Sequence, residues 1–319
     1  LGQFAVSNPG MIIIEMTNVA ADGRITPFCT GLYDDRTEAA LKRVIDYVKS
    51  LADVPIAIQL AHAGRKASTS PPWQGGASMG IDAGGWQTVA PSAIAHSAEA
   101  ALPRALSTME VEDLVEAFAM AAERALRTGF DAIELHGAHG YLLHQFLSPL
   151  SNQRDDQYGG TLENRMRFPL QVFDAVRSAW PDDKPLGMRI SATDWIDGGW
   201  DLPQSLALAH ELEQRHCDFL DVSSGGLADS QKVKAGPGYQ VPFAEQIKQQ
   251  TELAVMTVGM ITEAQQAESI ISNGQADLVA IARGFLYNPR WVWHAAHTLG
   301  HPLKYPDQYL RCAPARIAV

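Results

Sequence analysis

Short apolar segments alternate with amphipathic segments along most of the chain. Seven mainly apolar runs have the length of buried strands; they are residues 11–16, 56–60, 132–136, 186–190, 219–224, 253–259 and 278–283. Between runs, apolar residues recur every three or four positions, as in 113–129, which is typical of a helix that buries one face. Gly129 has the position of a helix C-cap, and the next run begins three residues later. This alternation predicts parallel strands joined by crossover helices.

The seven strands could form either an open sheet or a closed barrel. Polar or otherwise unusual residues stand at the carboxyl ends of six runs; they are Gln59, His136, Arg189, Ser224, Gly259 and Arg283. A barrel brings such ends together on one face, whereas an open sheet spreads them along a crevice. A length of 319 residues also suits a barrel. We therefore predict an α/β fold, a (β/α)8 TIM barrel forming one domain over residues 1–319. Since seven runs are visible, we expect the first strand to be absent from this chain, which would be incomplete at its N-terminus.

Two segments stand outside the strand–helix alternation. Residues 61–106 form a long stretch rich in Gly, Pro, Ser and Trp, and loops of this length in compact domains commonly carry function. We expect this stretch to be a folded excursion over the barrel mouth. Residues 301–319 are predicted to form a C-terminal tail.

Composition and charge exclude several classes of protein. Hydrophobic residues make up 46% of the chain, and the net charge of −11 leaves no basic stripe for nucleic acid. No apolar window is long enough to cross a membrane. The cysteines are Cys29, Cys217 and Cys312; they form neither a disulfide framework nor a C-x-x-C metal motif. This usage favours a reducing, cytoplasmic compartment.

The richest candidate chemistry follows the strand at 132–136. His136 ends that strand, and His139 and Tyr141 follow within five positions. Side chains alternate along a strand, so Glu134 shares the face of His136 and points into the barrel, where it needs a partner. Arg189 on the next strand is the expected partner.

Several roles are open to the two histidines. A histidine beside an apolar run is commonly structural, but two histidines and a tyrosine in one turn favour function. Metal binding is the weaker functional interpretation because the H-x-x-H spacing lies on a strand end and no third ligand is evident. Neutral imidazoles that polarise a carbonyl oxygen, with Tyr141 as proton donor, fit the three side chains better.

Two further groups of residues indicate a bound heterocycle and its phosphate. The Gln59 amide can both donate to and accept from a ring edge, although a polar cap at the barrel mouth is the alternative. Arg65 and Lys66 are either part of the site or solvated loop charges. The turns after the last two strands suit a phosphate because small residues allow backbone N–H groups to approach it; the candidates are Gly259, Ala282, Arg283 and Gly284. Flavin mononucleotide (FMN) is the simplest ligand that accounts for both a ring-edge amide and a phosphate-binding turn.

Several stretches of the sequence resemble those of a known family. The stretches "IQLAHAGRK" (58–66), "IELHGAHGYLLHQFLSPLSNQRDDQYGGTLENRMRF" (133–168), "RIS", "VSSGG", "VGMI" and "DLVAIARGFLYNPRW" (277–291) follow in order over almost the whole chain. They are similar to the Old Yellow Enzyme family of FMN-dependent ene-reductases, in particular its thermophilic-like, YqjM-type class. The resemblance implies an NAD(P)H oxidoreductase that reduces the C=C bond of α,β-unsaturated carbonyl compounds, with NADPH or NADH as reductant.

The resemblance also implies roles for individual residues. His136 and His139 would bind the carbonyl oxygen of the substrate, and Tyr141 would protonate the α-carbon. The flavin ring would be contacted by Gln59, Arg189 and the backbone of Met16; the phosphate would be held by Gly259, Ala282 and Arg283. Many relatives have glycine at the position of Ala282. Arg311 would reach the substrate site of a neighbouring subunit in a homo-oligomer, a dimer or tetramer.

Two alternatives remain open. A dienoyl-CoA reductase would need a cysteine-rich iron–sulfur segment, which Cys29, Cys217 and Cys312 cannot supply. A catalytically silent flavin-binding barrel is the second alternative, because the family's first strand carries residues that touch the flavin.

Overall fold

The computed structural model describes residues 1–312, and its centre is one parallel sheet. The strand order is β1-β2-β5-β6-β7-β8-β9. The strands are β1 (Ile12–Asn18), β2 (Ile56–Ala61), β5 (Ala132–Gly137), β6 (Leu186–Ser191), β7 (Phe219–Ser223), β8 (Ala254–Val258) and β9 (Leu278–Ala280). All seven predicted strands are present, and each pairs in parallel with its neighbour. The prediction of an α/β fold with a parallel sheet is confirmed.

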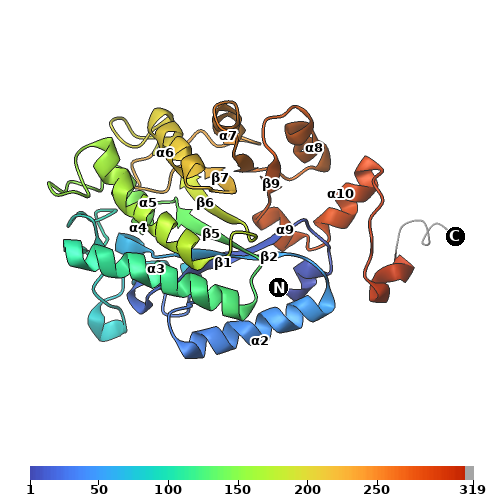
Figure 1. Cartoon of the computed structure of the whole chain (residues 1–319), viewed down its shortest axis with the longest axis horizontal. Coiled ribbons are helices and arrows are strands. Elements are labelled where there is room, and N and C mark those ends of the chain that lie inside the picture. Colours follow the sequence, from blue (N-terminus) through green and yellow to red (C-terminus); the bar gives the residue numbers. More distant parts are fainter. Residues whose placement is uncertain (313–319) are drawn as a thin grey trace.

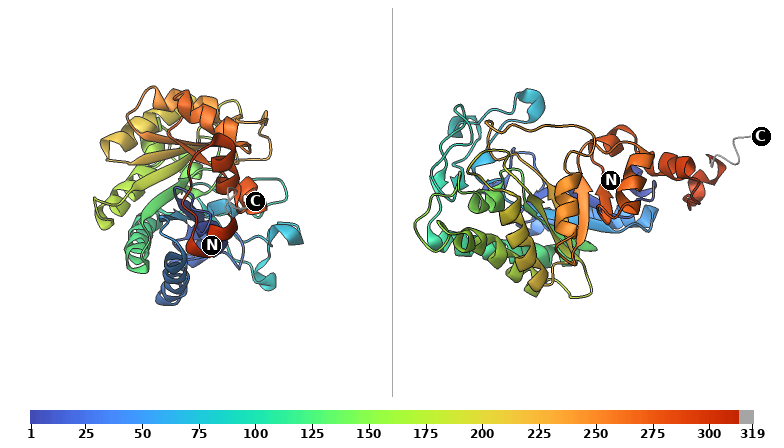
Figure 2. Two further views of the ribbon diagram at one scale, coloured as in Figure 1. Left: turned by 90° about the vertical axis from the view of Figure 1, so that its right-hand side faces the viewer. Right: turned by 90° about the horizontal axis from the view of Figure 1, so that it is seen from above.

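Helices follow the strands in sequence, and those that connect one strand to the next cover one side of the curled sheet (Figures 1 and 2). They are α2 (Asp35–Leu51), α3 (Thr108–Thr128), α4 (Leu142–Leu147), α5 (Leu162–Ala179), α6 (Leu202–Gln214), α7 (Val241–Lys248), α8 (Ala264–Ser272), α9 (Arg283–Tyr287) and α10 (Trp291–Leu299). Gly129 caps α3 with a φ of +93°, as predicted. A capping box of Ser107 and Glu110 begins the same helix.

The hydrophobic core fills the space between the sheet and this layer of helices. Strand residues that alternate with the site residues enter it, for example Ile133 and Leu135 on β5, and both are fully buried. Phe118 on α3 and Phe173 on α5 pack against them in the same cluster. The core therefore holds β5 rigidly from the helical side and leaves its other face for polar side chains.

The edge strands β1 and β9 are not paired with each other within residues 1–312. The short helix α1 (Gly2–Ala5) lies beside α9 and α10 near this edge (Figure 2). The rings of Phe4 and Phe285 are 5.4 Å apart, and Arg290 donates to the carbonyl oxygen of Gln3. The first and last parts of the described chain are thus in contact.

The segment 61–106 contains three short 3-10 helices, η2 (Gly64–Lys66), η3 (Pro72–Gln74) and η4 (Ile81–Ala83). It also contains a two-stranded parallel sheet of β3 (Val89–Ala90) and β4 (Arg104–Ala105). At the other end of the chain, η5 (Asp307–Cys312) lies in the predicted tail, of which 313–319 fall outside the described residues.

No helix in the described part of the chain is both long and apolar enough to cross a membrane. Cys29, Cys217 and Cys312 are all free thiols, as predicted.

Candidate active site

The turn after β5 brings the predicted His136, His139 and Tyr141 together. The ring centroids of His136 and His139 are 5.1 Å apart, and those of His136 and Tyr141 are 5.0 Å apart. Both pairs meet edge to face. The turn needs positive φ at two consecutive positions, +56° at His139 and +71° at Gly140. Two imidazoles and a phenol therefore face one another at the carboxyl end of a buried strand.

A buried hydrogen-bond network holds this turn from behind. The Gly140 N–H donates to Nδ1 of His144 at 2.9 Å, and His144 Nε2 lies 2.9 Å from Asp194 Oδ1. The other Asp194 oxygen accepts from the Ser148 hydroxyl and the Trp200 N–H. Burial alone would raise the pKa of Asp194, but His144 and these hydrogen bonds outweigh it and lower that pKa. A charged carboxylate thus orients His144, which fixes the turn after β5.

Arg65 and Lys66 tie the segment 61–106 to two other loops. Arg65 is buried and donates to the carbonyl oxygen of Leu227, after β7, at 2.9 Å. Lys66 donates to the carbonyl oxygens of His139 at 2.9 Å and Gly226 at 3.0 Å. Its Nζ also lies 5.3 Å from the centre of the Tyr141 ring. Both cations are therefore structural parts of the site, and the interpretation as solvated loop charges is wrong.

Burial sets the protonation states at this turn. Desolvation, followed by the positive charge of Arg189, lowers the pKa of both His136 and His139 well below its ordinary value. Desolvation also raises the pKa of Tyr141 to about 12 and lowers that of Lys66 to about 8. At neutral pH both imidazoles are neutral, so each has one N–H donor, and the phenol keeps its proton.

A second group of polar side chains lies on β2, β5, β6 and β7. Gln59 Nε2 donates to Glu134 Oε1 at 2.6 Å, and Arg189 Nε lies 3.1 Å from Asp221 Oδ2. The prediction that Arg189 is the direct partner of Glu134 is therefore wrong. The register explains the difference, because Gln59 is paired with Glu134 whereas Arg189 is paired with Asp221.

Met16 lies where the pairing of β1 with β2 is irregular. The register shifts between Ile14 and Thr17, which leaves the backbone around Met16 out of the regular ladder. The Met16 side chain packs with Ala61 and Ala63, and Tyr141 packs against the same cluster. Met16 is thus packed on the same cluster as the turn after β5.

The predicted phosphate residues follow β8 and β9. Gly259 has a φ of +123°, and an added Cβ would lie 2.7 Å from the buried amide of Gln240. Strand β9 ends at Ala280, three residues before the predicted end, because Arg283 already begins α9. Ala282 and Arg283 are exposed. This part of the site is much more open than the turn after β5.

A chain of hydrogen bonds connects the two parts. His139 Nε2 lies 2.7 Å from the Ser223 hydroxyl, which lies 3.3 Å from Gln240 Oε1. The Gln240 amide in turn donates to the carbonyl oxygen of Val258, the residue before Gly259. Ser224 also donates to Gln240 Oε1, at 2.7 Å. A buried glutamine therefore links His139 to the turn after β8.

Arg311 lies in η5 and is exposed. The structure does not bring it into the group formed by the other predicted residues.

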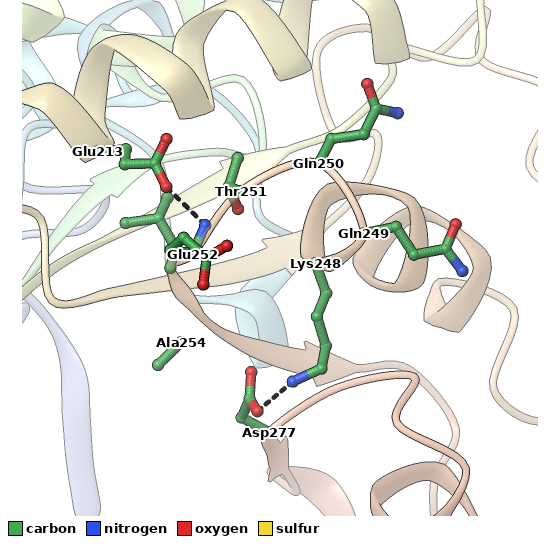
Figure 3. A pocket seen from close by; sticks show the side chains of 9 residues that line it. Glu213, Lys248, Gln249, Gln250, Thr251, Glu252, Ala254 and Asp277 are labelled. Atoms are coloured by element: carbon green, nitrogen blue, oxygen red, sulfur yellow. Dashed lines mark hydrogen bonds and ion pairs between the residues drawn. The ribbon is translucent and has the colours of Figure 1, made fainter.

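A hollow at the opposite end of the strands lacks comparable chemistry. Its lining is shown in Figure 3 and comprises Glu213, Lys248, Gln249, Gln250, Thr251, Glu252, Leu253, Ala254 and Asp277. Lys248 is paired with Asp277, and Glu213 accepts from the backbone N–H of Glu252. Ala254 begins β8, so this hollow lies at the amino ends of the strands, away from His136 and Arg189.

Comparison with known proteins decides the family. Residues 3–301 match the model of the NADH:flavin oxidoreductase / NADH oxidase family. The chain belongs to this family. The resemblance to Old Yellow Enzyme is thereby confirmed, and the protein is an FMN-dependent oxidoreductase whose reductant is NADPH or NADH.

Individual relatives of this flavin oxidoreductase are similar over most of their length. An NADPH dehydrogenase of Geobacillus sp. (strain WCH70) is 43% identical over 96% of this chain and 85% of its own. An NADPH dehydrogenase of Bacillus subtilis (strain 168) is 41% identical over the same shares. Among solved structures, morphinone reductase is 30% identical, with a TM-score of 0.77, 96% of this chain and 82% of its own covered.

The residues present fit FMN, by the chemistry of the donors that they offer. The guanidinium of Arg189 makes no hydrogen bond to another residue in the described range, and its side chain is 21% exposed. Gln59 uses one amide proton on Glu134 and keeps its carbonyl oxygen for a ring edge. The irregular backbone at Met16 adds unpaired peptide groups beside them. Arg283 offers positive charge at the turn where a phosphate would lie.

The motif search missed five residues that support this flavin oxidoreductase site; they are His144, Asp194, Asp221, Ser223 and Gln240. A signal existed for Asp221, an acidic residue inside the apolar run 219–224. The roles of the others depend on partners that the fold brings to them, such as Asp194 beside His144.

Proposed function

We propose that the protein is an ene-reductase, which reduces the C=C bond of α,β-unsaturated carbonyl compounds with NADPH or NADH. The observation that supports this most directly is the cluster of two neutral histidines and a protonated tyrosine in one turn. A carbonyl oxygen gains negative charge as a hydride reaches the β-carbon of an enone, so donors aimed at that oxygen lower the barrier. The names of the NADPH dehydrogenase relatives agree with the reductant.

FMN, held by Met16, Gln59, Arg189, Gly259, Ala282 and Arg283, would supply hydride transfer between NADPH and the alkene. Arg189 would place positive charge beside the pyrimidine ring, where negative charge is stabilised. The main-chain N–H groups near Gly259 and Ala282, together with Arg283, would bind the phosphate.

His136 and His139 would clamp the carbonyl oxygen of the substrate. Nδ1 of His136 is buried and has no hydrogen-bond partner within residues 1–312, so it is available to a ligand. His139 is bonded through Nε2 to Ser223. For Nδ1 of His139 to donate to the substrate, the Ser223 hydroxyl must donate to Nε2. The Ser224 hydroxyl then replaces the Ser223 hydroxyl as the hydrogen-bond donor to Gln240 Oε1.

Tyr141 would deliver the proton to the α-carbon. Its raised pKa keeps the phenol protonated at neutral pH, as a general acid requires. The nearby Lys66 ammonium favours the phenolate that forms after transfer.

We further propose that the functional protein is a complete (β/α)8 barrel in the cytoplasm and that its subunits assemble as a dimer or tetramer. Segment 61–106 would cover the mouth of that barrel. Exposed Arg311 would then reach the substrate site of a neighbouring subunit.

Anaerobic stopped-flow measurements with NADPH and 2-cyclohexenone test the catalytic proposal. We expect Tyr141→Phe to slow reoxidation by the enone about 100-fold and to leave reduction by NADPH nearly unchanged. Tyr47→Phe is the matched control, because Tyr47 lies 63% exposed on α2. Equal reoxidation rates in the two variants would exclude Tyr141 as the proton donor.

A further inference from the structure

Glu134 and Asp221 are buried carboxyl groups whose charges the catalytic proposal does not use. Glu134 is 0% exposed and Asp221 is 1% exposed. They lie on β5 and β7, on either side of the strand that carries Arg189. One oxygen of each is accounted for, because Glu134 Oε1 accepts from Gln59 and Asp221 Oδ2 lies 3.1 Å from Arg189 Nε.

The remaining oxygens lack a donor. Glu134 Oε2 and Asp221 Oδ1 are both buried without a hydrogen-bond donor among residues 1–312. The charge of Asp221 raises the pKa of Glu134, so the two carboxyl groups lie close enough to interact across β6. A carboxylate has no proton to donate, so the two groups can satisfy each other only if one of them is protonated.

The charges around the pair also indicate that only one of the two carboxyl groups is ionised. Gln59 faces it from β2, neutral His136 follows Glu134 on β5, and Arg189 faces it from β6. Arg189 is the one cation in the described chain that acts on both carboxyl groups. It balances one negative charge, and a second, unbalanced negative charge in this interior would be strongly unfavourable.

We propose that Glu134 and Asp221 share one proton and act as a positioning pair, which holds the Gln59 amide and the Arg189 guanidinium in place for FMN. Asp221 keeps the negative charge because it pairs with Arg189, and the proton stays mainly on Glu134. This inference rests on the proposed cofactor contacts of Gln59 and Arg189.

The pair makes the stability of the folded protein depend on pH. Burial, followed by the charge of Asp221, raises the pKa of Glu134 to about 8, and burial also raises that of Asp221. An unfolded glutamate loses its proton near pH 4.3. Between these values the folded chain holds a proton that the unfolded chain has lost, so stability falls as pH rises from about 4.3 to about 8.

Infrared spectroscopy of the full-length, FMN-loaded protein tests the shared proton directly. A protonated carboxyl group has its own C=O stretching band, distinct from that of carboxylates. In the unsubstituted protein we expect this band at pH 6.5 and its loss as pH rises through about 8. The absence of this band at pH 6.5 would overturn the proposal. This measurement requires no substituted protein.

Two substitutions separate a shared proton from simple burial. Glu134→Gln should remove the band, since its amide replaces the acid and still donates to Asp221. Asp221→Asn should also remove it, because Glu134 then ionises and pairs with Arg189. A band that persists in Asp221→Asn would show that burial alone keeps Glu134 neutral, and the sharing would be wrong. Glu268→Gln, an exposed change on α8, should leave the band intact.

The positioning role has its own measurement, the dissociation constant of FMN. We expect Glu134→Gln to remove the weakening of FMN binding above pH 8. Asp221→Asn should weaken binding about tenfold at pH 7, because Arg189 loses its ion-pair partner. Unchanged affinity and unchanged pH dependence in both variants would overturn the positioning role. Loss of enone reduction with an intact band and normal FMN binding would count against the proposed function and leave the pair standing.

Discussion

The two ends of the candidate site differ in how firmly the protein itself holds them. The turn after β5 is fixed by buried side chains, above all His144 and Asp194, both fully buried. The turn after β9 presents the exposed residues Ala282 and Arg283 at the start of a five-residue helix. Groups that react must be placed before substrate arrives, whereas a phosphate can organise the backbone that binds it. Under the proposed function, the difference predicts a preformed catalytic end and a cofactor end that is completed on binding.

Asp194→Asn should show the largest effect if the catalytic end is preformed. The asparagine amide would direct an N–H at groups that now donate to the carboxylate. These groups are either His144 Nε2 or the Ser148 hydroxyl and the Trp200 N–H. We expect a loss of about 3 kcal/mol in the free energy of unfolding, measured with urea, and slower enone reduction. Asp197→Asn is the matched control, because Asp197 is exposed on the same loop. Similar losses in both variants would contradict the role of the buried network.

Gly140→Ala tests the fit of the same turn with a smaller expected effect. A Cβ at Gly140 would lie 2.3 Å from the carbonyl oxygen of Gly226, and the φ of +71° adds strain. Gly274→Ala has nearly the same φ, +72°, but nothing within 4 Å of the new Cβ. We expect a destabilisation of about 2 kcal/mol at Gly140 and about 1 kcal/mol at Gly274. Thermal unfolding of the two variants compares them; equal shifts would mean that the turn can move.

Arg283→Ala should have the smallest effect on stability. It tests the contrast from the side of the turn after β9, where FMN binding rather than folding should change. Since Arg283 is exposed and unpaired within residues 1–312, the free energy of unfolding without FMN should change by less than about 0.5 kcal/mol. The dissociation constant of FMN should rise about tenfold, as for the loss of one charged phosphate contact. Arg36→Ala on α2 provides an exposed control. Unchanged FMN affinity would remove Arg283 from the phosphate site.

Much of the fold could be predicted because its signals are local. A run such as 132–136 is apolar over the length of one strand, and Gly129 marks the end of α3 without any tertiary information. The end of β9 was predicted three residues late, since "LVAIAR" stays apolar where the chain already turns into α9. Apolar content alone does not separate a buried strand from the turn that follows it.

The candidate site divides in the same way. His136, His139 and Tyr141 lie in one turn, so their proximity could be predicted from spacing. The partner of Glu134 could not, because it depends on the register between β2, β5 and β6, which strand patterns leave open. His144 and Asp194 meet only in the folded chain, so the residue that orients the catalytic turn carried no signal of its role.

Arg65 and Lys66 recognise main-chain carbonyls, and this has a consequence for engineering the segment 61–106. Their acceptors are the peptide oxygens of Leu227, Gly226 and His139, which are present whatever side chains those positions carry. The attachment of the segment 61–106 therefore does not depend on the side chains at the acceptor positions. Libraries that randomise exposed positions of this segment, such as Trp73 and Ile81, can therefore vary its surface without releasing it from the turn after β5.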